Sequence, residues 1–405
     1  MSKTGTDDTA ELGDLDITDE VSITGKSQAE TIIDAGGTDR IFQVLTNGIT
    51  LSPSNPGKLT LENLTLRNGS SGSGGAIAVT GILNVKNVAF FGNTASDSGG
   101  AIYAPDSLNI NSINLSDSTF EKNTAGFGGA IYLNHDATLK GLSLTQNTAS
   151  KNGGAIYNEG NTVTLETSVL TGNISRGDGG AIYSFGSLSV TSSSLTDNHA
   201  DLGNGGGIGL SGGTTNINSS TLDGNSARDG GAIGQIRFAQ RVTLVMTNST
   251  VSGNTAINAG GAIDILNANI TSSTIAFNQA APAKGGSFST NGSITLKNSI
   301  LSALTGGDCY GGPFDRGTIV SAGGNISSDA TCSLGTSDKA STVAKLEPLA
   351  NNGGLTRTHL ISTTSPALEL IDANLCPNVD QRGVTRPQGA KCDAGAVERR
   401  AGATP

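Results

Sequence analysis

Large aromatic residues are nearly missing from this chain of 405 residues, which has no Trp and only 4 % aromatics. Charged residues are also sparse, at 14 %. No apolar run approaches the roughly 18–20 residues of a membrane-spanning helix. These absences argue against ordinary globular domains and against a protein that spans a membrane.

Basic residues are too few for a nucleic-acid partner. The chain has 24 Lys and Arg against 34 Asp and Glu, which gives a net charge of −10 and a pI near 4.8. Nucleic acids and anionic membrane surfaces both require a basic patch on the protein. We therefore exclude both as partners.

Motifs of common enzymes are missing as well. No GxSxG, HExxH, GxxxxGK[ST] or dinucleotide fingerprint occurs in a supporting context. The three histidines, His135, His199 and His359, are scattered, and we expect them at turns or on the surface. The sequence identifies no catalytic residue and favours a protein that is not an enzyme.

Cysteine is confined to the last quarter of the chain, at Cys309, Cys332, Cys376 and Cys392. Their spacing fits no zinc motif. An even number of cysteines outside the repeated region predicts two disulfides, each between neighbours, in an oxidising compartment. The alternative is four reduced thiols in a cytosolic protein.

Glycine, in contrast, is abundant, with 58 residues, and it marks a repeat. In one copy, NTASKNGGAIY at residues 147–157, an Asn precedes a Gly-Gly pair and an Ile follows it. The Gly-Gly pairs lie 25 to 30 residues apart and begin at Gly74, Gly99, Gly128, Gly153, Gly179, Gly205, Gly230, Gly260 and Gly285.

Each repeat contains three short segments in which apolar residues alternate with polar ones, a pattern typical of β-strands. One repeat cannot bury its apolar side chains alone, so successive repeats must stack. Stacking predicts an all-β parallel β-helix of roughly twelve coils. Equivalent residues then form ladders, and the repeated Asn is expected to adopt a left-handed conformation and pass amide hydrogen bonds along the stack.

We divide the chain into three parts on this pattern. Residues 1–67 form an N-terminal segment and irregular first coils, and residues 68–301 form the regular repeats. Residues 302–405 form the last coils, a Cys-containing loop and a disulfide-stapled C-terminal cap. An uncapped end would expose unpaired strand edges, so we expect the cap to cover the end of the helix.

The repeat resembles a known family. GGAI motifs alternate with FxxN motifs, as in FFGN at residues 90–93 and FEKN at residues 120–123. This pattern resembles the repeats of chlamydial polymorphic outer-membrane proteins over about residues 68–290. The resemblance implies a right-handed, single-stranded parallel β-helix of the pectate-lyase-like kind, displayed at the cell surface and used in adhesion.

A second resemblance covers residues 346–398. The motifs PLANNGG, TSPALELID, DQRG, RPQG and CDAGAVE are similar to the end of bacterial choice-of-anchor Q proteins. These are surface or secreted β-helix proteins in which this part follows the β-helix and precedes a sorting signal. The resemblance implies an extracellular or cell-surface location, with the export signal and anchor expected outside this chain.

Two sets of outward-facing residues are candidate binding surfaces. A Tyr follows the repeated Ile in four successive repeats, and alternation points these rings outward as an exposed aromatic strip. The members of this strip are Tyr103, Tyr132, Tyr157 and Tyr183. The second set is a charged patch suited to acidic polysaccharides, formed by Arg228, Asp229, Arg237, Arg241 and Asp264. The simpler alternatives are rings that only stabilise the sheet and a solvated loop.

No cofactor is expected, although loop carboxylates could hold Ca²⁺. These carboxylates are Asp97, Asp178, Asp201 and Asp229, and they do not follow the calcium nonapeptide pattern. We expect no other metal site.

The sequence therefore favours a surface or secreted β-helix protein with a non-catalytic role in adhesion, binding or structural display. The expected partner is a polysaccharide or another cell-surface ligand. The alternative is a polysaccharide lyase or glycoside hydrolase acting on an acidic glycan. A structural or ice-binding surface is a third hypothesis.

Overall fold

The computed structural model describes residues 13–45, 56–105, 112–236, 242–311 and 317–400. The chain divides into two compact units, residues 1–188 and residues 189–405, called unit 1 and unit 2 below. Both are parallel β-solenoids, and together they contain about 11 turns. This confirms the predicted parallel β-helix, while the three sequence-based parts, 1–67, 68–301 and 302–405, stay a prediction.

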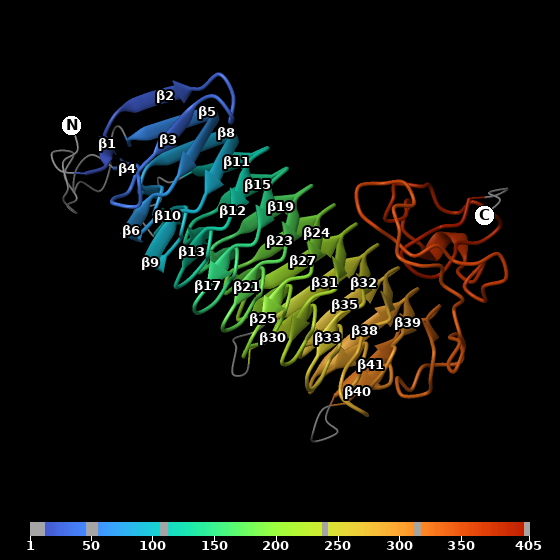
Figure 1. Ribbon diagram of the computed structural model, residues 1–405. Coiled ribbons are helices and arrows are strands. Elements are labelled where there is room, and N and C mark those ends of the chain that lie inside the picture. Colours follow the sequence, from blue (N-terminus) through green and yellow to red (C-terminus); the bar gives the residue numbers. More distant parts are fainter. Residues whose placement is uncertain (1–12, 46–55, 106–111, 237–241, 312–316, 401–405) are drawn as a thin grey trace. The chain divides into compact units, whose positions relative to one another are not determined.

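Unit 1 contains three parallel sheets whose strands recur at the same place in successive turns (Figure 1). The first sheet contains β1 (Leu15–Ile17), β4 (Phe42–Val44), β7 (Ile77–Val79), β10 (Ile102–Ala104), β14 (Ile131–Leu133), β18 (Ile156–Asn158) and β22 (Ile182–Ser184). The second contains β2 (Glu20–Thr24), β3 (Ile32–Asp34), β5 (Lys58–Arg67), β8 (Ile82–Phe91), β11 (Ser112–Ser116), β12 (Thr119–Glu121), β15 (Ala137–Lys140), β16 (Ser143–Thr145), β19 (Val163–Glu166) and β20 (Val169–Thr171). The third contains β6 (Ser70–Ser73), β9 (Thr94–Ser98), β13 (Thr124–Ala125), β17 (Thr148–Ala149) and β21 (Ile174–Ser175).

Unit 2 repeats this arrangement, and β23 (Leu188–Thr191) spans the boundary between the units. Its first sheet contains β26 (Ile208–Leu210), β30 (Ile233–Gln235), β34 (Ile263–Asp264), β37 (Phe288–Ser289) and β40 (Cys309–Tyr310). Its second contains β24 (Ser194–Thr196), β27 (Thr214–Asn218), β28 (Thr221–Asp223), β31 (Thr243–Thr247), β32 (Thr250–Ser252), β35 (Asn267–Thr271), β36 (Thr274–Ala276), β38 (Ser293–Lys297), β39 (Ile300–Ser302), β41 (Thr318–Ser321) and β42 (Ile326–Ser327). Its third contains β25 (His199–Ala200), β29 (Ser226–Ala227) and β33 (Thr255–Ala256).

The interior consists of columns of identical or similar apolar residues. Ile131 pairs with Ile102 on one side and Ile156 on the other, and all three are fully buried. In the second sheet, the rings of Phe90 and Phe120 stack with centroids 4.5 Å apart and planes 4° apart. Each ring therefore covers the face of its neighbour, which is how a chain with few aromatics fills its core.

The repeated Asn forms a buried amide ladder, as predicted. Asn147 Nδ2 donates to Asn173 Oδ1 at 3.0 Å and to the Phe120 carbonyl at 2.9 Å. Its backbone N–H donates to the same Asn173 oxygen at 3.0 Å. Equivalent side-chain bonds join Asn93, Asn123 and Asn147 in unit 1 and Asn198, Asn225, Asn254 and Asn278 in unit 2.

The left-handed residue of this turn is not the ladder Asn, and that part of the prediction is wrong. Positive φ angles fall one residue earlier, as at Gln146, where φ is 54°, and at Gly172, where φ is 63°. Asn68, the first Asn of the repeat in the sequence, is itself such a residue, with φ of 54°. Gly69 occupies the ladder position there, and its N–H donates to Asn93 Oδ1 at 2.9 Å. Because the carboxamide of the ladder Asn points inward, the positive φ angle falls on the residue before it.

The Gly-Gly pairs allow adjacent turns to approach closely. Gly153 has a φ of 69°, which disfavours any residue with a Cβ. At Gly154, an added Cβ would lie 2.0 Å from the Gly180 carbonyl oxygen of the next turn. The two glycines of a pair are therefore required for different reasons, backbone conformation and contact between turns.

Residues 346–399, called the C-terminal segment below, have little regular structure beyond the short 3₁₀ helix η1 (Ala373–Leu375). The segment lies along the outward side of β28, β32 and β36 in unit 2, whereas we expected it over the end of the helix. Three threonines of these strands bond to it: Thr221 to the Arg357 carbonyl at 2.6 Å, Thr250 to Gln381 Oε1 at 2.6 Å, and Thr274 from the Ala396 N–H at 3.0 Å.

The two disulfides join neighbouring cysteines, which confirms that pairing. Cys309 on β40 is bonded to Cys332, and Cys376 is bonded to Cys392. The first closes the last turns of unit 2. The second holds the C-terminal segment together near a cluster of buried apolar residues that includes Ile300 and Ile371.

Candidate functional site

The four predicted tyrosines form one column on the first sheet of unit 1. Their strands β10, β14, β18 and β22 pair in register, so each ring lies beside the next. Ring centroids are 5.1 Å apart for Tyr103 and Tyr132, 5.2 Å for Tyr132 and Tyr157, and 4.6 Å for Tyr157 and Tyr183. The last two pairs are parallel within 6°, whereas Tyr103 is tilted by 40°.

The column is less exposed than a flat aromatic strip would be. Tyr132 and Tyr183 are only 9 % and 8 % exposed. Alternation directs the rings away from the core, but a strand spacing of about 4.8 Å makes each ring cover its neighbour's face. Burial raises the pKa of Tyr157, as do the negative charge of a neighbouring tyrosinate and a hydrogen bond with Tyr183. The rings inside the column therefore offer a ligand their edges and hydroxyl groups, because their faces are covered by neighbouring rings.

Three residues from successive turns of the same unit add charge and a fifth aromatic ring to the column. Phe127 meets Tyr157 edge-on, with centroids 5.1 Å apart. Lys151 Nζ lies 4.2 Å from the centre of the Phe127 ring and 3.7 Å from Asp97 Oδ1. The column together with Asp97, Phe127 and Lys151, which bring both signs of charge beside aromatic edges, is called the tyrosine surface below.

The predicted charged patch is only partly described. Arg237 and Arg241 lie outside the described residues. Arg228 Nε donates to Asp229 Oδ2 at 3.1 Å, and Arg228 Nη2 donates to Asn204 Oδ1 at 2.9 Å. Asp264 lies on β34, in register with Gly234. Arg228 is thus held by the adjacent Asp229 and by Asn204 of the preceding turn.

Two more of the loop carboxylates have protein partners. Asp201 lies 2.9 Å from His199 Nε2, and Asp229 accepts from Arg228 and from the Ala259 N–H. Within the described ranges, no group of three or more His, Cys, Asp or Glu side chains could hold a metal ion. No helix in the same described ranges is long and apolar enough to cross a membrane.

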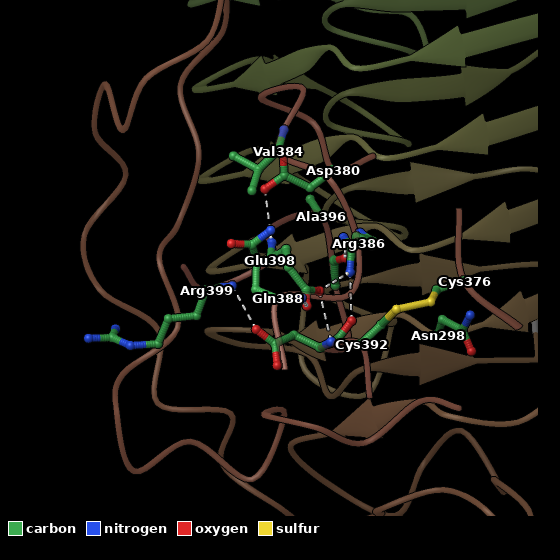
Figure 2. Close-up of polar contacts among 12 residues, drawn as sticks. Asn298, Cys376, Asp380, Val384, Arg386, Gln388, Cys392, Ala396, Glu398 and Arg399 are labelled. Carbon is green, nitrogen blue, oxygen red and sulfur yellow. Dashed lines mark hydrogen bonds and ion pairs between the residues drawn. A yellow bond between two sulfur atoms is a disulfide. The ribbon is translucent and has the colours of Figure 1, made fainter. Parts of the chain in front are cut away.

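Sequence reasoning missed a buried charged network in the C-terminal segment (Figure 2). Arg386 Nη1 donates to Glu398 Oε2 at 3.0 Å, and neither side chain is exposed by more than 1 %. Arg386 also donates to the carbonyls of Asp393 and Gly395, each at 2.7 Å. Glu398 accepts the N–H groups of Gln388 and Asp393, each at 2.9 Å.

A second buried ion pair lies beside this one. Asp380 Oδ2 accepts from the Arg382 guanidinium at 2.7 Å and from the Glu398 N–H at 2.9 Å, while its Oδ1 accepts the Val384 N–H at 2.9 Å. Apart from Val384, the residues of the two ion pairs and their partners come from the DQRG, RPQG and CDAGAVE motifs. The motifs therefore stabilise the fold of the segment. The feature of the sequence that could have indicated the buried ion pairs is the presence of charged residues among small ones.

His359 joins the C-terminal segment to unit 2's β32 and is buried, not at the surface as predicted. Its Nε2 lies 2.8 Å from Ser252 Oγ and its Nδ1 lies 2.7 Å from the Glu347 carbonyl. Phe277 packs against the imidazole with centroids 5.1 Å apart. His135 is also buried, and its Nε2 contacts the Pro105 carbonyl.

Acid is expected to weaken the attachment of the C-terminal segment through His359. Burial lowers the pKa of His359 below its usual 6.5. Below pH 6.5 the unfolded chain binds a proton that the folded protein does not, so the free energy of unfolding falls by at most about 1.4 kcal/mol per pH unit. Hydrogen exchange in residues 346–399 at several pH values measures this loss. His359→Gln should remove it, and His199→Gln, which changes a half-exposed imidazole, should not.

Comparison with known proteins finds one family. Four stretches of unit 1 match the Chlamydia polymorphic membrane protein repeat: residues 87–105, 117–134, 141–159 and 167–184. The match confirms the resemblance over these stretches, which make up less than a fifth of the chain. No curated protein and no solved structure matches the chain. Each matched stretch contains one tyrosine of the column, namely Tyr103, Tyr132, Tyr157 or Tyr183.

Proposed function

We propose that this protein is a non-catalytic β-helix of the cell surface or of the secreted fraction, and that it binds an extracellular ligand through the tyrosine surface of unit 1. One observation carries the proposal: the four stretches that match the membrane-protein repeat are the four that supply the tyrosines. The two disulfides support an oxidising location.

The chemistry of the tyrosine surface suits binding. Tyrosine hydroxyls and ring edges supply donors, acceptors and apolar contact at little conformational cost. Lys151 and Asp97 add one charge of each sign at the edge of the column. Aromatic and basic residues of this kind carry much of the binding energy at protein surfaces.

The enzymatic alternative has less support. It relied on arginines facing the carboxylates of an acidic glycan, and the one described arginine of that patch, Arg228, is paired with Asp229. We therefore do not advance the lyase or hydrolase hypothesis further.

The proposal is tested by measuring binding of the whole chain to an array of glycans and extracellular matrix proteins. The double variant Phe127→Ala/Lys151→Ala should weaken binding by about tenfold or more, as expected for a surface centred on these side chains. Ile257→Ala is the matched control, because Ile257 is an exposed loop residue of unit 2.

Equal losses in the two variants would contradict a specific role for the tyrosine surface. A parallel screen for unsaturated uronates, followed by ultraviolet absorbance, tests the non-catalytic part. Release of such products by the purified chain would show that the protein is an enzyme.

A further inference from the structure

The tyrosine column has a gap at one end. In the first sheet of unit 1, Ala78 on β7 pairs with Tyr103 on β10 on one side and with Gln43 on β4 on the other. A methyl group thus stands where the next four outward positions carry a ring. Ala78 and Tyr103 are both partly exposed, whereas Tyr132, which has a ring on each side, is buried.

The gap has the thickness of one ring. Gln43 and Tyr103 are two strand spacings apart, about 9.5 Å. A ring packed between two surfaces needs about 3.5–4 Å on each side, or 7–8 Å in all. Tyrosine centroids elsewhere in the column are only 4.6 to 5.2 Å apart, which leaves no room for a ligand ring. The face of Tyr103 toward Ala78 is therefore a place in unit 1's column where a ligand ring fits against a described tyrosine.

The wall opposite Tyr103 is polar. Arg40 Nη1 donates to the Gln43 amide oxygen and to Asp14 Oδ2, the latter at 2.9 Å. Arg40 Nη2 donates to Ser71 Oγ at 2.9 Å. The Gln43 amide is thus held by its oxygen, and its NH₂ group is the donor end.

We propose that the gap over Ala78 is a subsite for one pyranose ring of a neutral saccharide, between Tyr103 and Gln43. The C–H face of a pyranose packs on the electron-rich face of a tyrosine, and its hydroxyl edge bonds to the amide. A purely aromatic ligand would displace water from the Gln43 amide and would offer no hydrogen bond in its place, which is unfavourable. The negative charges of Asp97 and Glu159 act on Tyr103, which makes its surroundings less favourable for an acidic sugar than for a neutral one.

This inference rests on the proposed function, which identifies the first sheet of unit 1 as the binding surface. It adds the chemical class of the ligand and the subsite for one of its rings. Saturation-transfer NMR of the whole chain with maltose, cellobiose, lactose and N,N′-diacetylchitobiose tests it. At least one disaccharide should bind. Ala78→Tyr, which continues the column and fills the gap, should weaken that binding by about tenfold, and so should Tyr103→Ala.

Thr119→Tyr is the matched control, because it adds the same ring at an exposed outward position of β12, and it should leave binding unchanged. Absence of binding to all four disaccharides overturns the subsite, as does binding that Ala78→Tyr does not weaken. Binding of a lysine-rich peptide alone, lost in Ala78→Tyr, would show a cation site instead. If array binding falls in Phe127→Ala/Lys151→Ala but not in Ala78→Tyr, only the subsite is contradicted.

Discussion

Replacing Arg386 with alanine should lower the free energy of unfolding by about 3–5 kcal/mol, because it leaves the buried carboxylate of Glu398 without its partner. Burial already raises the pKa of Glu398, against the opposing effect of hydrogen bonds from Asp393 and Gln388 and of the Arg386 charge. The carbonyls of Asp393 and Gly395 would also lose their donor. Hydrogen exchange should rise throughout residues 346–399, and equilibrium denaturation measures the free energy.

An exposed ion pair in the same segment provides the control. Lys391 Nζ lies 2.7 Å from Asp372 Oδ1, and the two side chains are 48 % and 63 % exposed. Lys391→Ala should therefore cost about 0–1 kcal/mol. A similar cost for Lys391→Ala and Arg386→Ala would contradict the role given to burial.

The double variant Arg386→Met/Glu398→Gln separates the ion pair from the loss of packing. It removes the buried negative charge together with the positive one, so it should be less destabilised than Arg386→Ala. A double variant as unstable as the single one would mean that the backbone hydrogen bonds of Arg386, rather than the charge pair, stabilise the segment.

The regular part of the fold was predictable because each position repeats. Ile102, Ile131 and Ile156 recur at one offset from the Gly-Gly pair, and only stacking buries such a column. The same argument identified the Asn ladder. The disulfides were predicted on other grounds, from an even number of cysteines that lie outside the repeat and close together in pairs. Where a side chain contacts the equivalent side chain of the next turn, the spacing of the repeat is enough to predict the contact.

The parts that do not repeat were beyond this argument. Nothing periodic in the C-terminal segment indicates that Gln381 meets Thr250, 131 residues earlier in the chain. In the tyrosine column, alternation predicts a direction for Tyr132 but not its burial, because the neighbouring rings decide the burial. Arg228 shows the same limit, since its charge suggested a ligand and its partner is the adjacent Asp229. Charge and direction can be inferred from sequence, whereas partners outside the repeat require coordinates.

Replacing Asn147 with alanine should also destabilise unit 1 strongly, by several kcal/mol, because each buried group left without a partner costs about 1–3 kcal/mol. The Asn147 oxygen accepts both the backbone N–H and the side-chain NH₂ of Asn123, each at 3.0 Å. Its own NH₂ group bonds to Asn173 and to the Phe120 carbonyl. Alanine removes all of these side-chain bonds in a place that water does not reach. Equilibrium denaturation followed by circular dichroism measures the cost.

The preceding residue offers a test of the same turn without loss of the ladder. Gln146 has a φ of 54°, and glycine occupies the equivalent positions at Gly92 and Gly172. Gln146→Gly relieves the unfavourable backbone angle but adds freedom to the unfolded chain, so the net change should stay within about 1 kcal/mol. If Gln146→Gly and Asn147→Ala were equally destabilising, the turn conformation rather than the amide ladder would determine the stability of this repeat. A large loss confined to Asn147→Ala would instead assign it to the ladder, which couples each turn to the next.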